Sequence, residues 1–253
     1  MTISSICRNL KYIFLPSVLW LGVWQFAAHT VGQELLLPTP VSVLQTLLVL
    51  GCTPAFWHTV YTTLLRVLAG MLWGALAGIA LAALTYASAW CHRLFAPTIR
   101  IIRAAPVVSF ILFLLLWSRR GSVPAIVAGL MVLPVLWEST SRGLRETDGH
   151  LLELAKAYRF SLWKKIRLIY LPSALPYFFS SAASAIGLAW KSGVAAETIC
   201  LAPVSIGLNM QQTKLYLDTP GLFAWTAVVV TLSLVLEGLL TVLSRRLERR
   251  WKV

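Results

Sequence analysis

The stretch Ala69–Ala87, AGMLWGALAGIALAALTYA, decides the fold of this chain. It contains no charged side chain and, as an α-helix, is about as long as the ~30 Å hydrocarbon core of a membrane is thick. Gly70, Gly74 and Gly78 recur at every fourth position and therefore line one face of that helix. Because small residues let two helices approach closely, the stretch predicts a transmembrane helix that packs tightly on another helix.

The composition of the whole chain also indicates a membrane protein. Of its 253 residues, 58% are hydrophobic and only 12% are charged, whereas soluble domains carry about 25% charged residues. The eleven tryptophans agree, since tryptophan is favoured at the boundary between membrane and water. The apolar runs are continuous and lack the alternation of transmembrane barrel strands, so we predict an all-α polytopic membrane protein.

The apolar runs predict about six transmembrane helices in a single membrane domain. The expected spans are about 12–30, 60–87, 104–117, 123–137, 175–197 and 222–243. The first run follows basic residues, as in a signal peptide, but it reaches membrane length and is followed by a poor cleavage site, so we interpret it as a retained helix. Residues 41–50 are too short to span and are expected to form an interfacial helix or an ordered loop.

Basic residues set the expected orientation. Lysines and arginines are concentrated near both termini, before the third span and in the long connector 138–172, and few lie on the opposite side. Since cytoplasmic loops of membrane proteins are rich in these residues, we expect both termini and the connector to be cytoplasmic. The formal net charge of +13 then follows mostly from topology, and a nucleic-acid partner is not expected.

The connector holds a pattern beyond its charge. Leu151, Leu154, Ala155 and Tyr158 have the spacing of one apolar face of a short helix, which Asp148 can cap at its start.

A second short helix is expected to follow, with Ser161 as its cap, and to end near Pro172, whose ring cannot continue it. Aromatic side chains such as Trp163 suit a protein interface, but they equally suit helices that lie on the membrane surface, and a plain solvated loop would explain the charge alone.

The stretch Glu153–Pro172, ELAKAYRFSLWKKIRLIYLP, resembles the EAA loop of ABC-transporter permeases of the binding-protein-dependent importer class. Glu153-Leu154-Ala155 matches the start of that loop, Ser161-Leu162-Trp163 its middle and Tyr170-Leu171-Pro172 its end. Leu154 replaces an alanine. Arg159 replaces a glycine that normally permits a turn with positive φ.

Further segments are similar to permeases of the nitrate/sulfonate/taurine branch of this family. They are Leu37–Pro40, Thr63–Gly70, Arg103–Pro106, Gly187–Trp190, Ala195–Glu197 and Ser205–Gly207. The resemblance therefore extends over most of the chain and implies the fold of a type I ABC importer permease in the bacterial plasma membrane.

The resemblance also implies partners and roles. A second permease subunit, identical or different, would complete the pathway, two ATP-binding cassette subunits would lie beneath it, and an extracytoplasmic solute-binding protein would deliver the solute. The loop 148–172 would couple to the ATPase through Leu151, Glu153, Leu154, Ala155, Tyr158, Arg159, Ser161 and Trp163. The chain has no GxxxxGK[ST] motif, so ATP and magnesium are expected in the partner, and the chain itself is expected to be non-catalytic and without a cofactor.

Lys191 is the clearest candidate for a residue of the translocation pathway. A charge in the middle of a span is costly, so it suggests contact with the solute, an ion pair with an acid on another helix, or a side chain that extends to the membrane boundary. Trp190, Ser192 and Glu197 are neighbouring pathway candidates, although core packing suits Trp190 better and a polar contact at the helix end or between subunits suits Glu197 better. Glu237 is a further acid that could pair with Lys191 or with Arg66, which otherwise would extend to the membrane boundary.

Other classes of protein fit less well. The four cysteines and four histidines lack metal-ligand spacing, and no constellation for an intramembrane enzyme is visible, so no metal site is expected. A secondary transporter or channel that works without an ATPase is the main alternative, but the internal inverted repeats that such folds often carry are not visible.

Overall fold

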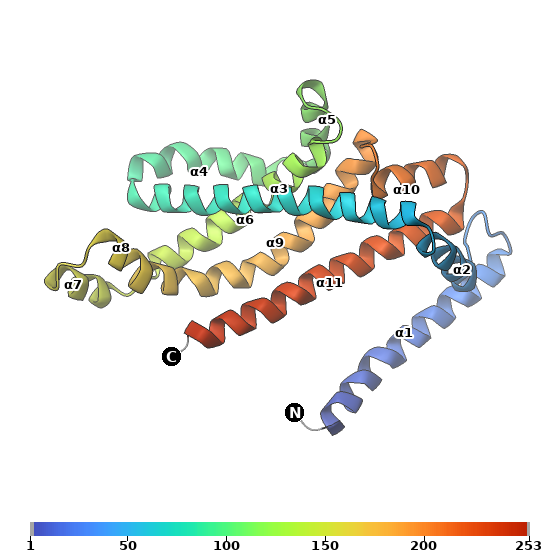
Figure 1. Ribbon diagram of the computed structural model, residues 1–253, viewed down its shortest axis with the longest axis horizontal. Helices are drawn as coiled ribbons and strands as arrows, with labels where there is room; N and C mark the ends of the chain where they lie inside the picture. The colour runs from blue at the N-terminus through green and yellow to red at the C-terminus, as the bar shows by residue number, and fades with distance from the viewer. Residues whose placement is uncertain (1–2, 252–253) are drawn as a thin grey trace.

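The computed structural model describes residues 3–251, with side chains described for 16, 18–244 and 246. Every regular element of that part is a helix (Figure 1). In chain order the helices are α1 (Ile3–Val31), α2 (Pro40–Gly51), α3 (Pro54–Ala87), α4 (Ala89–Ala104), α5 (Val107–Trp117), α6 (Val123–Arg145), α7 (Gly149–Ala157), α8 (Leu162–Lys165), the π-helix η1 (Ile166–Tyr170), α9 (Leu171–Cys200), α10 (Ile206–Leu215) and α11 (Thr219–Trp251).

Helices α3, α6 and α9 form the centre of the molecule, and glycines let α3 and α6 approach closely. A Cβ atom placed on Gly70 would lie 2.1 Å from the carbonyl oxygen of Ala125, and one on Gly74 would lie 2.3 Å from that of Gly129. These separations are far shorter than a van der Waals contact, so the two backbones can be this close only at glycine. The predicted packing face of the helix is confirmed.

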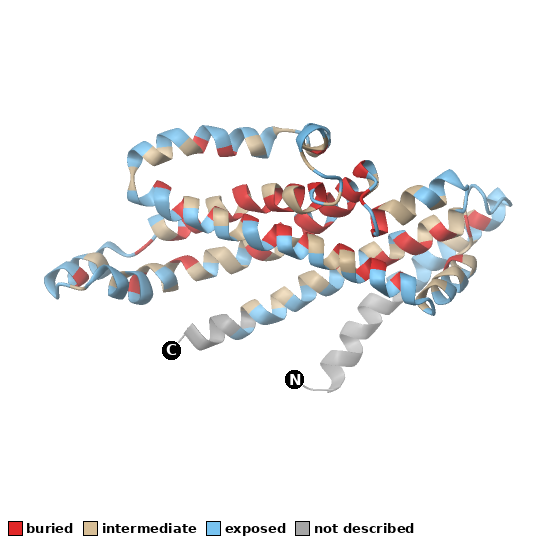
Figure 2. Cartoon of the chain, turned by 45° about the horizontal axis from the view of Figure 1, so that its top comes forward, coloured by how far each residue is buried: buried red, intermediate tan, exposed pale blue. Residues whose placement is uncertain are grey.

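The core lies between these three helices, with α11 covering α9. Trp190 is completely buried, and its Nε1–H donates a hydrogen bond to the carbonyl oxygen of Val229 on α11 at 2.9 Å. Buried residues gather along α6 and the second half of α9, whereas the outer faces of α3 and α11 are exposed (Figure 2). Those outer faces carry large apolar side chains such as Leu72 and Leu234, which suits a surface in contact with lipid or with another subunit.

Three of the described helices are long and apolar enough to cross a membrane: Pro54–Ala87, Val123–Arg145 and the Thr219–Ser244 part of α11. The bent pair α4 and α5 would make a fourth if it counts as one span. Helix α1 has an apolar segment, Val18–Val31, within its described side chains, and the basic residues before it lie outside them. Helix α9 has the length of a span, but it is rich in alanine, serine and glycine and largely surrounded by other helices.

The third predicted span, 104–117, contains α5 and the bend that precedes it. The chain bends by 105° between α4 and α5, so α5 is a short helix turned sharply away from α4. The break lies at Ala105 and Pro106, where the proline has no N–H to donate and holds the residue before it in an extended conformation. The apolar run identified the helix but gave no sign of its direction.

The first part of the predicted connector 138–172 is helical. Helix α6 continues to Arg145, so residues 138–145 form its last turns, and the chain leaves this helix at Glu146. Residues 41–50, expected as an interfacial helix or a loop, form most of α2, which Thr39 caps by accepting a hydrogen bond from the Ser42 N–H.

Candidate functional site

The loop between α6 and α9 forms one end of the molecule, which we call the loop end (at the left of Figure 1). Its first helix, α7, starts at a side-chain cap, because the Asp148 carboxylate accepts a hydrogen bond from the His150 N–H at 2.8 Å. The predicted role of Asp148 is therefore confirmed.

Helix α7 ends at a left-handed residue that is not glycine. Arg159 has φ of +51°, a conformation that costs a residue with a side chain about 1–2 kcal/mol. The Phe160 N–H donates to the carbonyl oxygen of Ala155 at 2.9 Å and the Arg159 N–H to that of Lys156 at 3.1 Å, which is the hydrogen-bond pattern of a Schellman cap. Arginine thus keeps the turn for which the resembling family uses glycine.

The second helix of the loop does not end where the sequence predicts. Ser161 caps α8 by accepting from the Lys164 N–H at 3.4 Å, as expected, but the chain then continues through η1 directly into α9. Pro172 lies in the first turn of α9, where a missing N–H is tolerated, and the wider π-helical turn precedes it. The expected stop at Pro172 is therefore wrong, and the loop is joined to α9 without a break in helical structure.

The loop exposes several large apolar side chains that the described residues leave uncovered. Leu154 is 52% exposed, Tyr158 71% and Trp163 70%, and Leu151 is also exposed. Ala155 differs, since it is only 1% exposed and faces the interior of the loop. Of the four residues expected on one apolar face, three are therefore at the surface and one supports the loop from within.

The candidates for the pathway have different surroundings. Lys191 is exposed and forms no ion pair with the described residues. Trp190 belongs to the core, as its size suggests, and Ser192 is buried with its hydroxyl donating to the Leu188 carbonyl oxygen at 2.7 Å. Of these three residues, only Lys191 lies at the surface of the described chain.

Glu197 is the centre of a buried polar cluster at the end of the bundle opposite to the loop end. Its carboxylate accepts from Arg66 Nη1 at 2.5 Å and from Thr63 Oγ1 at 3.0 Å, and the Gly207 N–H lies 3.4 Å away. Arg66 also donates from Nη2 to the carbonyl oxygen of Pro203 at 3.1 Å. The Glu197 side chain is 0% exposed. We call this group, with the backbone that it binds, the Glu197 cluster.

The Glu197 cluster joins α3, α9 and the start of α10. Thr63 extends it, because its hydroxyl accepts a hydrogen bond from the Ile206 N–H at 3.0 Å. The suggestion that Arg66 pairs with Glu237 or extends to the membrane boundary is wrong, since Arg66 is held by Glu197. The two residues are 131 positions apart in the chain, so local spacing in the sequence does not indicate that they pair.

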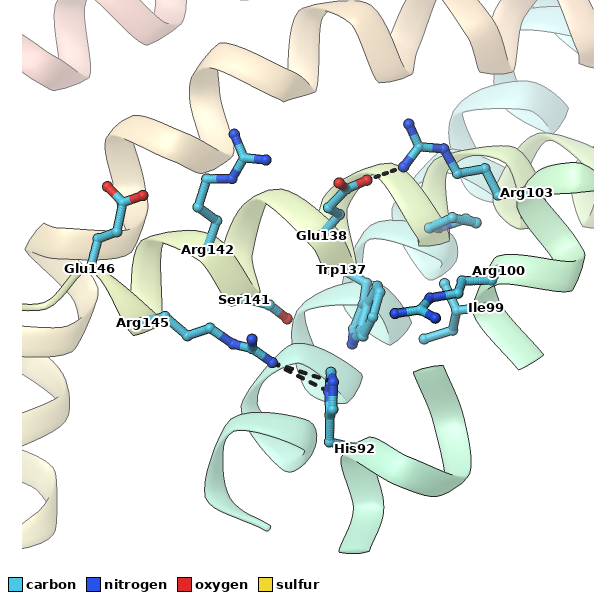
Figure 3. Close-up of a pocket in the computed structure, with 11 residues that line it drawn as sticks. His92, Ile99, Arg100, Arg103, Trp137, Glu138, Ser141, Arg142, Arg145 and Glu146 are labelled. Carbon is cyan, nitrogen blue, oxygen red and sulfur yellow. Dashed lines mark hydrogen bonds and ion pairs between the residues drawn. The ribbon is translucent and has the colours of Figure 1, made fainter. Parts of the chain in front are cut away.

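A second polar site lies near the loop end, in a groove between α4 and α6 (Figure 3). The sequence alone explained the arginines of this site only as part of the general excess of positive charge. The polar residues that line it are His92, Arg100, Arg103, Trp137, Glu138, Ser141, Arg142, Arg145 and Glu146. We call it the arginine groove.

The model of the family described as "Binding-protein-dependent transport system inner membrane component" matches residues 70–249. The chain belongs to this family of ABC importer permeases. The Escherichia coli protein SsuC, named as a permease for aliphatic sulfonates, is 29% identical over 94% of this chain and 89% of its own length. A Haemophilus influenzae protein named as an ABC transporter permease is 30% identical over 90% of this chain and 93% of its own.

The fold agrees with this family. One chain of the inward-facing MetNI methionine ABC transporter superposes with a TM-score of 0.64 and 19% identity, over 79% of this chain and 99% of that chain. The predicted type I importer fold and the predicted branch are confirmed, the latter by similarity to permeases named for sulfonates and for taurine. The chain is the membrane-spanning permease subunit of an ATP-driven importer and lies in the bacterial inner membrane.

Proposed function

We propose that the loop 148–172 docks on a separate ATP-binding subunit and transmits its movements to the membrane helices. The observation that carries this proposal is the exposure of Leu154, Tyr158 and Trp163, which form an apolar and aromatic surface that the described residues leave uncovered. Large aromatic residues of this kind supply much of the binding energy at protein interfaces. Glu153 and Arg159 are exposed beside them and provide charge at the edge of the surface.

The buried position of Ala155 separates two roles within the loop. Ala155 and the cap residue Ser161 shape the loop, whereas Leu151, Leu154, Tyr158 and Trp163 are the side chains that contact the partner. A bulky charge at Ala155 would therefore damage the loop itself, so exposed positions give the cleaner test of docking.

The complete importer in this proposal contains a second permease subunit, two ATP-binding cassettes and an extracytoplasmic solute-binding protein. ATP and magnesium bind to the cassettes, and this chain hydrolyses nothing. Both termini and the loop end face the cytoplasm, in keeping with the excess of lysine and arginine there. The exposed Lys191 contributes positive charge to the pathway between the two permeases.

The test compares two tryptophans of similar exposure. Trp163→Ser removes the main aromatic side chain of the loop, and Trp20→Ser removes one that is 68% exposed on α1. Each variant is co-expressed with its cognate ATPase, and recovery of the ATPase on the purified permease and ATP-driven uptake are measured. We expect Trp163→Ser to reduce ATPase recovery at least about tenfold, as loss of an interface anchor does, while Trp20→Ser retains it.

Equal recovery with both variants would contradict docking through this surface. A separate experiment addresses the alternative of a secondary transporter or channel. Uptake into vesicles driven by an ion gradient alone, without ATP and the ATPase, would overturn the assignment to an ATP-driven importer.

A further inference from the structure

The arginine groove has more positive charge than its own acids can balance. Among the described residues the ion pairs are Arg66–Glu197 and Arg103–Glu138, so Arg100, Arg142 and Arg145 have no carboxylate within ion-pair distance. The other acid of the groove, Glu146, accepts a hydrogen bond from the Tyr177 hydroxyl.

Aromatic side chains form part of the walls of the groove. The Trp137 indole Nε1–H donates to Thr85 Oγ1 on α3 at 3.0 Å, which fixes the ring between α3 and α4. The His92 ring stacks on Trp137, with 6.1 Å between ring centroids and 19° between planes. Arg145 Nη2 lies 3.4 Å from His92 Nδ1 and 3.5 Å from Nε2. These contacts are long, so the guanidinium keeps donors available.

A buried hydroxyl in the groove lacks a partner. Ser141 is 8% exposed, and its Oγ has no hydrogen-bond partner among the residues that the structure describes. In Figure 3 this hydroxyl points into the space between Arg145 and Trp137, and the Arg100 guanidinium extends toward the other side of Trp137. Buried polar groups are almost always hydrogen-bonded, so an orphaned hydroxyl beside cations indicates a missing acceptor.

We propose that the arginine groove binds a phosphate-type oxyanion. Its volume of about 390 Å³ accommodates such a group, and guanidinium donors with a serine hydroxyl match its several acceptor oxygens. The oxyanion is the headgroup phosphate of an anionic phospholipid, which basic pockets between membrane helices bind, or a free phosphate, which presents the same acceptor oxygens. The proposal is independent of docking through the loop.

The test measures thermal unfolding of the full chain in an uncharged detergent. Phosphatidylglycerol or phosphatidylcholine is added to the micelles, or inorganic phosphate is added against chloride at equal ionic strength. A ligand that binds the folded state raises the unfolding temperature in a saturable way, which gives an apparent affinity. Stabilisation by phosphatidylglycerol alone identifies a lipid headgroup, and stabilisation by inorganic phosphate identifies the free ion.

Variants tie the effect to the groove. Arg100→Gln/Arg145→Gln should weaken the apparent affinity about tenfold for each arginine removed. The matched pair Arg119→Gln/Arg120→Gln, exposed in the connector between α5 and α6, should leave it unchanged.

Ser141→Ala provides a second test that leaves every charge in place, and it should weaken binding about threefold to tenfold. The groove proposal is overturned if neither ligand stabilises the protein saturably. It is equally overturned if the two arginine pairs reduce affinity alike, since the effect would then be non-specific attraction. ATPase recovery by the groove variants should match that of the unmodified chain, which distinguishes failure here from failure of loop docking.

Discussion

The two polar sites of this permease use the same residue type in opposite ways. In the Glu197 cluster, Arg66 is almost enclosed, with 13% of its side chain exposed, and its charge is matched by a carboxylate that is fully buried. In the arginine groove, Arg100, Arg142 and Arg145 are exposed and lack a carboxylate partner in the described chain. An arginine with an internal partner joins helices, whereas arginines without one are available to something outside the chain.

This difference indicates that one end of the molecule contributes mainly to stability and the other mainly to the binding of partners. The end that holds the Glu197 cluster is closely packed, and its polar groups satisfy one another. The loop end exposes both charge and apolar surface, such as Trp163, which is 70% exposed. Changes at the first end should lower stability, and changes at the second should affect binding of partners.

The largest effect is expected where α3 meets α6. Gly74→Leu would force a side chain into a space where even a Cβ atom lies 2.3 Å from the Gly129 carbonyl oxygen, so the helices must separate. We expect loss of folded protein, measured by size-exclusion chromatography in detergent. Gly22→Leu on α1, where no atom lies within 4 Å, is the control and should have little effect. A folded Gly74→Leu variant would show that the close approach is not needed.

The comparison of paired charges is tested next. Glu197→Ala leaves Arg66 enclosed without its carboxylate, and breaking a buried pair in this way costs about 3–5 kcal/mol. Glu138→Ala breaks the exposed pair with Arg103 and should cost less than about 1 kcal/mol. The free energy of unfolding of both variants is measured by denaturant titration in one detergent. Similar losses of unfolding free energy in the two variants would contradict the distinction between the buried and the exposed ion pair.

The smallest effect is expected in the loop, and it has the opposite sign. Arg159→Gly relieves the left-handed conformation at φ of +51° and should stabilise the loop by about 0.5–1 kcal/mol. Lys156→Gly, placed inside α7, should instead destabilise it by about 1 kcal/mol. Hydrogen exchange of the loop amides measures both changes. Faster exchange in Arg159→Gly would mean that the arginine side chain supports the turn.

Some of these features could be predicted from sequence because they depend on neighbours along the chain. The glycine stripe of α3 and the caps at Asp148 and Ser161 follow from local spacing and residue chemistry, and all three are present. The requirement for positive φ at position 159 also followed from the family pattern, and arginine meets it.

Other features depend on contacts between distant segments and were not accessible. The pair Arg66–Glu197 joins helices α3 and α9, and no periodicity links the two residues. The groove arises because α4 folds back beside α6, which places Arg100 and Arg145 in the lining of one groove. At Ala105–Pro106 the chain bends sharply, whereas at Pro172 it continues from η1 into α9. A proline in the sequence therefore predicts neither the direction of a bend nor that a helix ends there.

The π-helical turn η1 has a consequence for how force travels through the permease. Because it joins α8 of the loop to α9 without a coil, residues 162–200 form one continuous helical segment about 60 Å long. The far end of this segment is fastened to α3 by Glu197. If the loop were tilted, α9 would therefore turn about the point where Glu197 holds it to α3. The displacement of α9 would be largest at the end next to the loop and smallest near Glu197.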